Sequence, residues 1–377
     1  MTSRMVILAG EPSGDVLGAR LMRAVEQVKG KAHWSGMGGP EMQAAGLVSS
    51  EDMNQLSVIG LAEALTAYSR LSGLADRLID HIIDVRPEVV FTVDSKAFSV
   101  RLARRLKKRL KGGDWRPKLV HMVAPTIWAW GEWRKAAFED SFDVLLCLFP
   151  FEPELFAPDK LAAVFVGHPQ ADPDPDPYDE LSQSYDLAVL PGSRRSELVH
   201  HLPVMLPVLA RLHDSHGPLK VVLPAVAHLH DDIVQMVSAA KLDHMISVRQ
   251  IPARQALGQS GAMMAASGTV TLEAAVNAVP GVVVYHLSPL NRLFARLFYK
   301  QDTPVLPDLI LNKRHYPYLL SPHLTEQRLY DEMAQLLDNL PRRRAEMRVA
   351  SQQLRHLLKA GEGCFTDNLA QCLARLI

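Results

Sequence analysis

The chain has 377 residues, 41 lysines and arginines against 41 aspartates and glutamates, and a hydrophobic content of 48%. At roughly 150 residues per domain this length predicts two domains, and the zero net charge argues against nucleic acid as a partner. The sequence has three cysteines, Cys147, Cys364 and Cys372. They are too few and too scattered for a disulfide framework or a zinc knuckle.

In the first part of the chain, short β-branched runs alternate with helical periodicity. Strands are predicted at Met5–Ala9, His33–Met37, Val89–Val93, Leu119–Met122 and Val144–Leu148. Helices are predicted at Val16–Val28, Leu71–Val85 and Phe98–Lys108. Such alternation is typical of βαβ units around a parallel sheet. The first domain is predicted to cover residues 1–170.

Aspartate and proline alternate in the segment Ala171–Pro177, so it is predicted to be a linker rather than a helix or a central strand. The alternation of strands and helices then restarts. The next strands are predicted at Leu187–Leu190, Lys220–Leu223, Met245–Arg249, Gly261–Ala265 and Val282–Tyr285. The second domain is predicted to cover residues 178–345, and the pattern is purely helical from Thr325 to Ile377.

The predicted fold class is α/β, with two doubly wound, Rossmann-like domains, a cleft between them and C-terminal helices. The helices at about residues 350–377 could pack back on the first domain. In such sheets, ligands bind at the carboxyl ends of the strands. The loops that follow the strands are therefore the first places to look for a site.

The loop after the first strand carries two carboxylates, Glu11 and Asp15. Negative charge disfavours a bound pyrophosphate, so this is not a typical dinucleotide loop. Ser13 or Asp15 could cap the helix that follows. Glu11 is instead a candidate for holding a polar, hydroxyl-rich substrate.

The second domain carries loops of the opposite character. Its first strand is followed by Gly192, Ser193 and Arg194. A later strand is followed by Ser267, Gly268 and Thr269. Backbone N–H groups, the helix dipole and a guanidinium suit a diphosphate, and Glu273, one turn after Thr269, could accept hydrogen bonds from a ribose. Each loop alone also fits an ordinary strand–helix turn, and together they favour a nucleotide diphosphate.

Two other sequence features could form a binding surface or a metal site. Trp128, Trp130 and Trp133 follow the strand that ends at Met122, which fits either a ligand wall or a satellite hydrophobic cluster. Histidine pairs occur at residues 200–201 and at residues 228 and 230. Their spacing directs the side chains to different sides of a helix. We therefore interpret them as solvated surface and predict neither a metal nor a cofactor.

A cationic amphipathic helix is predicted after Pro289. Its apolar face includes Leu293, Phe294, Leu297 and Phe298. The helix could pack on the core or lie on a membrane surface, and the weakly polar stretch Val58–Tyr68 could join it there. No stretch of the sequence is typical of a membrane span or a signal-peptide core, so membrane contact is predicted to be peripheral.

Six segments resemble the lipid-A-disaccharide synthase family, in the same order along the chain. They are Ala9–Asp15, Pro125–Trp130, Leu148–Glu152, Gly167–Pro169, Leu190–Arg194, and Ala266–Thr269 with Glu273. The resemblance implies a GT-B inverting glycosyltransferase that joins UDP-2,3-diacylglucosamine to 2,3-diacylglucosamine 1-phosphate and releases UDP. It also implies a peripheral position on the cytoplasmic face of the inner membrane, and a homodimer is a further possibility.

The resemblance also suggests roles for individual residues. Asp94, directly after a strand, would be the general base, and Glu11 is the next candidate. Alternatively, Asp94 is a cap or an ion-pair partner of Lys96. The second domain would bind the donor. The acceptor would contact Ser13, Trp128, Trp130 and Asp308.

Three segments depart from the family pattern, at Lys96–Ala97, at Asp308 and at Tyr318. These departures leave open a catalytically impaired or acceptor-altered membrane-associated relative. An enzyme that uses UDP-N-acetylglucosamine, such as a 2-epimerase, is the other alternative.

Overall fold

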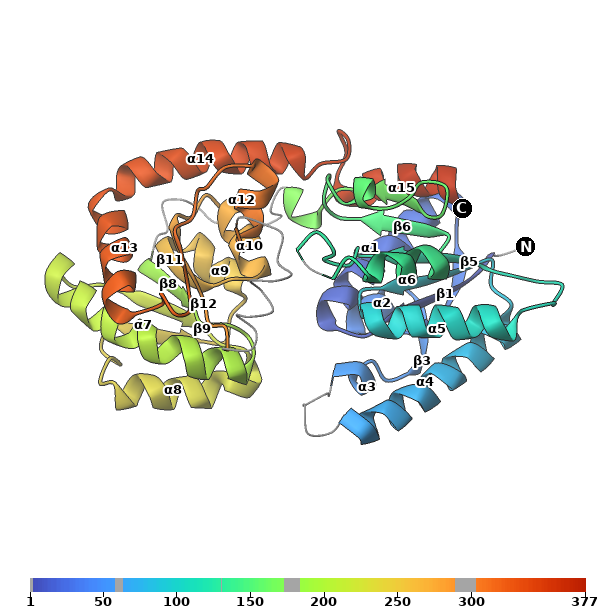
Figure 1. The fold of residues 1–377 in the computed structure, drawn as a ribbon, viewed down its shortest axis with the longest axis horizontal. Coiled ribbons are helices and arrows are strands. Elements are labelled where there is room, and N and C mark those ends of the chain that lie inside the picture. The colour runs from blue at the N-terminus through green and yellow to red at the C-terminus, as the bar shows by residue number, and fades with distance from the viewer. Residues whose placement is uncertain (1–2, 58–63, 130, 173–183, 289–302) are drawn as a thin grey trace. The chain divides into compact units, whose positions relative to one another are not determined.

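The computed structural model describes residues 3–57, 64–129, 131–172, 184–288 and 303–377. The chain forms two compact α/β units, shown in Figure 1. The first comprises Met1–Pro169 with Leu358–Ile377, and the second comprises Gln170–Leu357. Most of the predicted Asp-Pro linker and the whole predicted amphipathic helix lie outside the described residues.

The first unit is built on a seven-stranded parallel sheet with the order β3-β2-β1-β4-β5-β6-β7. Its strands are β1 (Ser3–Ala9), β2 (Ala32–Met37), β3 (Leu47–Glu51), β4 (Val89–Val93), β5 (Lys118–Met122), β6 (Val144–Cys147) and β7 (Ala162–Phe165). Its helices are α1 (Pro12–Lys29), α2 (Pro40–Ala44), α3 (Asn54–Ser57), α4 (Ala64–Val85), α5 (Lys96–Arg109), α6 (Arg134–Ser141) and α15 (Phe365–Leu376).

Helices cover both faces of this sheet, which is why its central strands are apolar on both sides. Along β1, Met5 and Ile7 pack toward α1 and α15, whereas Val6 and Leu8 pack toward α4 and α5. The C-terminal helix α15 contacts α1 directly, so the last residues of the chain complete the core of the first unit.

The second unit repeats this plan with a six-stranded parallel sheet of order β10-β9-β8-β11-β12-β13. Its strands are β8 (Tyr185–Leu190), β9 (Val221–Pro224), β10 (Ile246–Arg249), β11 (Ser260–Ala266), β12 (Gly281–Tyr285) and β13 (Tyr318–Leu320). Its helices are α7 (Arg195–His216), α8 (His230–Ala239), α9 (Ala253–Gly258), α10 (Thr269–Val276), α12 (Leu306–Leu311), α13 (Glu326–Asp338) and α14 (Leu340–Leu357).

The predicted fold class is confirmed, and every predicted strand is present with ends within two residues of the prediction. The described sheets contain three further strands, β3, β7 and β13, which the sequence analysis missed. All three are sheet edges, and each has only three to five residues. Edge strands are short and bury little apolar surface, so they leave a weak pattern. Among the described helices, none is long and apolar enough to cross a membrane.

Candidate active site

Each sheet reverses its strand order at one point, between β1 and β4 in the first unit and between β8 and β11 in the second. Open α/β sheets bind ligands at such switch points, beside the carboxyl ends of the strands. The acidic loop follows β1, and Asp94 follows β4. The two loops predicted to bind phosphate follow β8 and β11. The structure therefore brings each predicted pair of loops to a switch point.

In the first unit, Gly10 allows the two switch-point loops to approach each other closely. A Cβ atom on Gly10 would lie 2.6 Å from the Ser95 Oγ and 2.2 Å from a Leu56 methyl carbon. A larger residue would have to displace the Ser95 and Leu56 side chains. The glycine thus keeps the backbone next to Glu11 close to the backbone next to Asp94.

Asp94 and Ser95 both adopt left-handed backbone conformations, with φ of 51° and 43°. Such φ values are costly for residues with side chains, and they concentrate at functional sites. The Lys96 Nζ donates to the Asp94 Oδ1 at 2.6 Å, and each side chain is about a quarter exposed. The ion pair left open by the sequence is therefore present. Asp94 still has exposed surface through which it could meet a hydroxyl.

A buried histidine lies in the sheet beside Asp94. The His121 Nδ1 is 2.7 Å from the Thr92 Oγ1, and the ring stacks on Phe142. Burial, assisted by the positive charge of Lys96, lowers the pKa of His121 to about 3. His121 is therefore neutral at physiological pH and does not neutralise Asp94.

Glu152, after β6, is a buried carboxyl that the sequence analysis did not assign to the site. Its Oε2 accepts the backbone N–H groups of Leu148 and Phe149, both at 3.1 Å. Burial raises the pKa of Glu152 to about 7, against the lowering effect of these two hydrogen bonds and of the Lys96 charge. Asp94, Lys96 and Glu152 thus form an electrostatically linked group at the carboxyl ends of β4 and β6.

Asp15 has a structural role that differs from the predicted one. Its carboxylate accepts the backbone N–H groups of Gly39, Glu41 and Met42 at 2.8–3.1 Å. It therefore caps α2 rather than its own helix, whose N-cap is Glu11. Neither Ser13 nor Asp15 caps α1. Glu11 and Ser13 are exposed at the N-terminus of α1, where a ligand could reach them.

Trp128 belongs to an aromatic cluster beyond β5 and β6. Its ring meets Phe151 edge-on at 5.8 Å, and Phe149 stacks between Phe151 and His168 at 5.9 and 5.3 Å. All four side chains are partly exposed, so the cluster could present a wall to a ligand. Trp133 is largely exposed, and Trp130 lies outside the described residues.

In the second unit, Arg194 is the N-cap residue of α7, and its side chain is 80% exposed. The Glu197 Oε2 accepts the backbone N–H groups of Ser193 and Arg194 at 3.0 and 3.3 Å. Gly192, at φ 121°, has no room for a Cβ because this carboxylate lies 2.3 Å from where it would be. Two N–H groups expected to face a phosphate are therefore occupied by Glu197, whereas the guanidinium is displayed.

The loop after β11 keeps more of its predicted character. Gly268 and Thr269 are exposed, and Gly268 is the N-cap of α10. The Ser267 hydroxyl donates to the Pro304 carbonyl at 2.8 Å, which leaves its lone pairs to accept. Glu273 is partly exposed, and burial raises its pKa while the Arg254 charge opposes the shift. These groups could receive the hydroxyls of a ribose.

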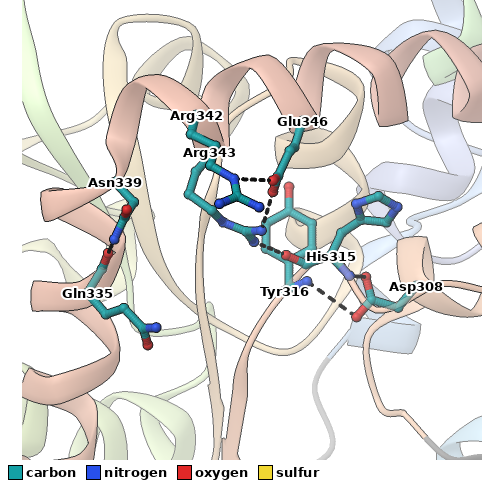
Figure 2. A network of polar contacts seen from close by, with 8 residues as sticks. All are labelled: Asp308, His315, Tyr316, Gln335, Asn339, Arg342, Arg343 and Glu346. Carbon is teal, nitrogen blue, oxygen red and sulfur yellow. Dashed lines mark hydrogen bonds and ion pairs between the residues drawn. The ribbon is translucent and has the colours of Figure 1, made fainter.

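Asp308 is buried rather than displayed, and Figure 2 shows its contacts with His315 and Tyr316. Its oxygens accept the backbone N–H groups of His315 and Tyr316 at 3.0 and 3.4 Å, and burial raises its pKa to about 6. The Arg343 guanidinium holds the same segment by donating to the His315 carbonyl and to Glu346. These hydrogen bonds give the Asp308 carboxylate a structural role, and its contact with an acceptor stays a prediction.

The histidine pair at residues 200–201 is not all solvated surface. His201 is 1% exposed, and its imidazole is hydrogen-bonded on both sides. Unlike the exposed His200, His201 lies on the apolar face of α7 with Leu198 and Met205, so the periodicity of the helix could have indicated its burial. Among the described residues, no group of three or more potential ligands is arranged to hold a metal ion.

Comparison with known proteins identifies similar sequences along most of the chain. Residues 5–372 match the family model described as lipid-A-disaccharide synthetase. The lipid-A-disaccharide synthase of Azotobacter vinelandii is 34% identical over 346 residues, which cover 89% of this chain and 90% of that protein. The synthase of Alcanivorax borkumensis is 31% identical over 382 residues, covering 99% and 97% of the two chains.

Solved structures with the same fold are much more distant in sequence. Anabaena HepE in complex with UDP has a TM-score of 0.56 at 10% identity, and the match covers 100% of this chain and 99% of that one. A UDP-GlcNAc 2-epimerase from Neisseria meningitidis bound to UDP-GlcNAc has a TM-score of 0.62 at 11% identity, with the same coverage. At such low identity, these structures support the fold alone.

Proposed function

Because the chain belongs to the lipid-A-disaccharide synthetase family, we propose that it joins UDP-2,3-diacylglucosamine to 2,3-diacylglucosamine 1-phosphate. The products are lipid A disaccharide 1-phosphate and UDP. The chain is thus a UDP-sugar-dependent glycosyltransferase of lipid A biosynthesis. The observation that carries this proposal is the family match over residues 5–372, which includes the loops at both switch points.

The second unit binds the donor in this proposal. Arg194 contacts the diphosphate, the N-termini of α7 and α10 add their dipoles, and Glu273 accepts the ribose hydroxyls. Gly192, Ser193, Ser267, Gly268 and Thr269 form the two loops that approach the nucleotide. For the Ser193 and Arg194 N–H groups to reach a phosphate, the Glu197 carboxylate has to move away from them.

The first unit binds the acceptor, with Ser13 and the Trp128 cluster as proposed contacts. The acceptor 6-hydroxyl oxygen attacks the anomeric carbon of the donor while the bond from that carbon to the diphosphate oxygen breaks. Asp94 takes the hydroxyl proton, and Glu11 is the second candidate for this role. Arg194 and the helix N-termini stabilise the negative charge that develops on the leaving UDP.

A UDP-release assay tests this proposal. Purified protein with both acylated sugars in mixed micelles is expected to release one UDP for each disaccharide detected by mass spectrometry. Omitting the acceptor should abolish release. Epimerisation of UDP-N-acetylglucosamine in the absence of an acceptor would instead support the epimerase alternative, which the family match does not favour. Binding of UDP-sugar without any release would support a catalytically impaired relative.

We further propose that the protein binds the cytoplasmic face of the inner membrane peripherally, through Leu293, Phe294, Leu297 and Phe298. This rests on the sequence pattern, because these residues lie outside the described part of the structure. Changing both Phe294 and Phe298 to serine should move most of the protein from anionic vesicles to the supernatant in a sedimentation assay. A large fall in melting temperature would show instead that the helix is core. A homodimer also stays a prediction.

A further inference from the structure

We propose that His201 is a positioning residue that holds the donor-binding loops of the second unit in register, an inference that rests on the proposed donor site. His201 lies in the second turn of α7, and its side chain is 1% exposed. The His201 Nδ1 is 2.7 Å from the Pro191 carbonyl oxygen, directly after β8. The backbone N–H of His286, directly after β12, donates to the His201 Nε2 at 2.9 Å.

These two hydrogen bonds join the carboxyl ends of strands that are not neighbours. In the sheet order, β11 lies between β8 and β12, so the imidazole connects the strands on either side of the loop that carries Ser267. A further contact extends the connection to β13, because the His286 Nδ1 is 3.1 Å from the Ser321 Oγ. His201 and His286 together therefore connect the strand ends at the edge of the sheet where the donor is proposed to bind.

The contacts also fix the protonation state of His201. Since Nε2 accepts a hydrogen bond, the hydrogen of the neutral ring is on Nδ1 and is donated to the Pro191 carbonyl. Protonating Nε2 would place a hydrogen against the His286 N–H and break that contact. Burial lowers the pKa of His201, while its bond to Pro191 and the nearby Glu197 charge oppose the shift. The neutral form that both loops need is therefore the stable form.

The charges of two neighbouring groups act on the pKa of His201. His200 stacks on His286 with ring centroids 4.1 Å apart, and its positive charge would lower the pKa of His201 further. Glu197 acts in the opposite direction and also binds the Ser193 N–H. A pH profile alone therefore cannot separate these groups, and matched variants are needed.

His201→Leu removes both hydrogen bonds and replaces the imidazole with an apolar side chain of similar size. We expect it to raise the dissociation constant for UDP, and the KM for UDP-sugar, by about tenfold, because both donor loops lose the hydrogen bonds that order them. The kcat should change much less, because His201 does not touch the reacting atoms. Amide hydrogen exchange should become faster at residues 192–194 and at His286.

Two variants serve as controls. His213→Leu removes a histidine from the far end of the same helix, where its Nδ1 accepts the Leu219 N–H at 3.2 Å. It should leave UDP affinity within about twofold of wild type, whatever it does to the melting temperature. His201→Gln keeps a neutral donor and acceptor at every pH. It should recover part of the UDP affinity that His201→Leu loses. Protonation of His201 is expected to weaken UDP binding at acid pH, and His201→Gln should reduce this effect. His200→Gln measures how much of the effect comes from His200.

The outcomes distinguish this inference from the proposed function. Unchanged UDP affinity and unchanged exchange at residues 192–194 in folded His201→Leu would overturn the positioning role while leaving the donor site in place. If wild-type protein does not bind UDP at all, the proposed function fails, and hydrogen exchange still decides whether His201 orders the loops. Should His201→Leu not fold, the same measurements on His201→Gln give the answer.

Discussion

Asp94→Asn is expected to lower the rate of disaccharide formation by about 10²–10⁴ while leaving the dissociation constant for UDP unchanged. Asparagine keeps the shape of the side chain but cannot take the proton of the acceptor hydroxyl. The left-handed backbone at Asp94 and Ser95 supports this role, because the strain holds the carboxylate at the carboxyl end of β4. Rates and UDP affinity measured on the same preparations separate catalysis from donor binding.

The Asp94–Lys96 ion pair gives a direct test of the alternative in which Asp94 only stabilises the fold. A purely structural pair predicts that Lys96→Met and Asp94→Asn lower the melting temperature by similar amounts, with matching losses of rate. A catalytic Asp94 predicts a rate loss well beyond that of Lys96→Met. Asp80→Asn is the control, since Asp80 is an exposed partner of Arg109 in the same unit. A near-wild-type rate in Asp94→Asn would transfer the role of base to Glu11.

The sequence was sufficient to predict which strands exist and which loops lie at the switch points. The central strands are apolar on both faces, so runs such as Val89–Val93 stand out from their polar surroundings. Parallel βαβ units place all carboxyl ends on one edge of a sheet. Once the strands are known, the positions of Asp94 and Arg194 in the fold follow from the chain order.

The partners of individual side chains could not be predicted in this way. Asp15 caps a helix that begins 25 residues later, because the tertiary fold brings the N-terminus of α2 against α1. Glu152 belongs to a segment that resembles the family, but its burial, which raises its pKa to about 7, could not be predicted from that segment. His201 shares a dipeptide with the exposed His200. The apolar periodicity of α7 includes His201, but its hydrogen bonds to residues after β8 and β12 leave no local signal, so these roles need coordinates.

Arg194→Ala is expected to cost about 2–4 kcal/mol of transition-state stabilisation, which corresponds to about a 30- to 900-fold loss of kcat/KM. The Arg194 side chain is 80% exposed at the N-terminus of α7, so its guanidinium is accessible to a diphosphate and the side chain buries little surface. Its pairing with Glu197, at 3.7 Å and mostly in solvent, adds little stability. The variant should therefore fold with a nearly unchanged melting temperature and bind UDP more weakly.

Arg195→Ala is the matched control for this prediction. Arg195 is the next residue in the chain, its side chain is also mostly exposed, and it pairs with Asp232 at 2.8 Å rather than with Glu197. If Arg194 acted only through its positive charge, both variants would weaken UDP binding to a similar extent. A direct contact between Arg194 and the diphosphate predicts a large loss of UDP affinity in Arg194→Ala only. Since Glu197 occupies the Ser193 and Arg194 N–H groups, the guanidinium has to carry most of the attraction to the diphosphate. Unchanged UDP affinity and rate in Arg194→Ala would therefore show that the donor diphosphate binds elsewhere.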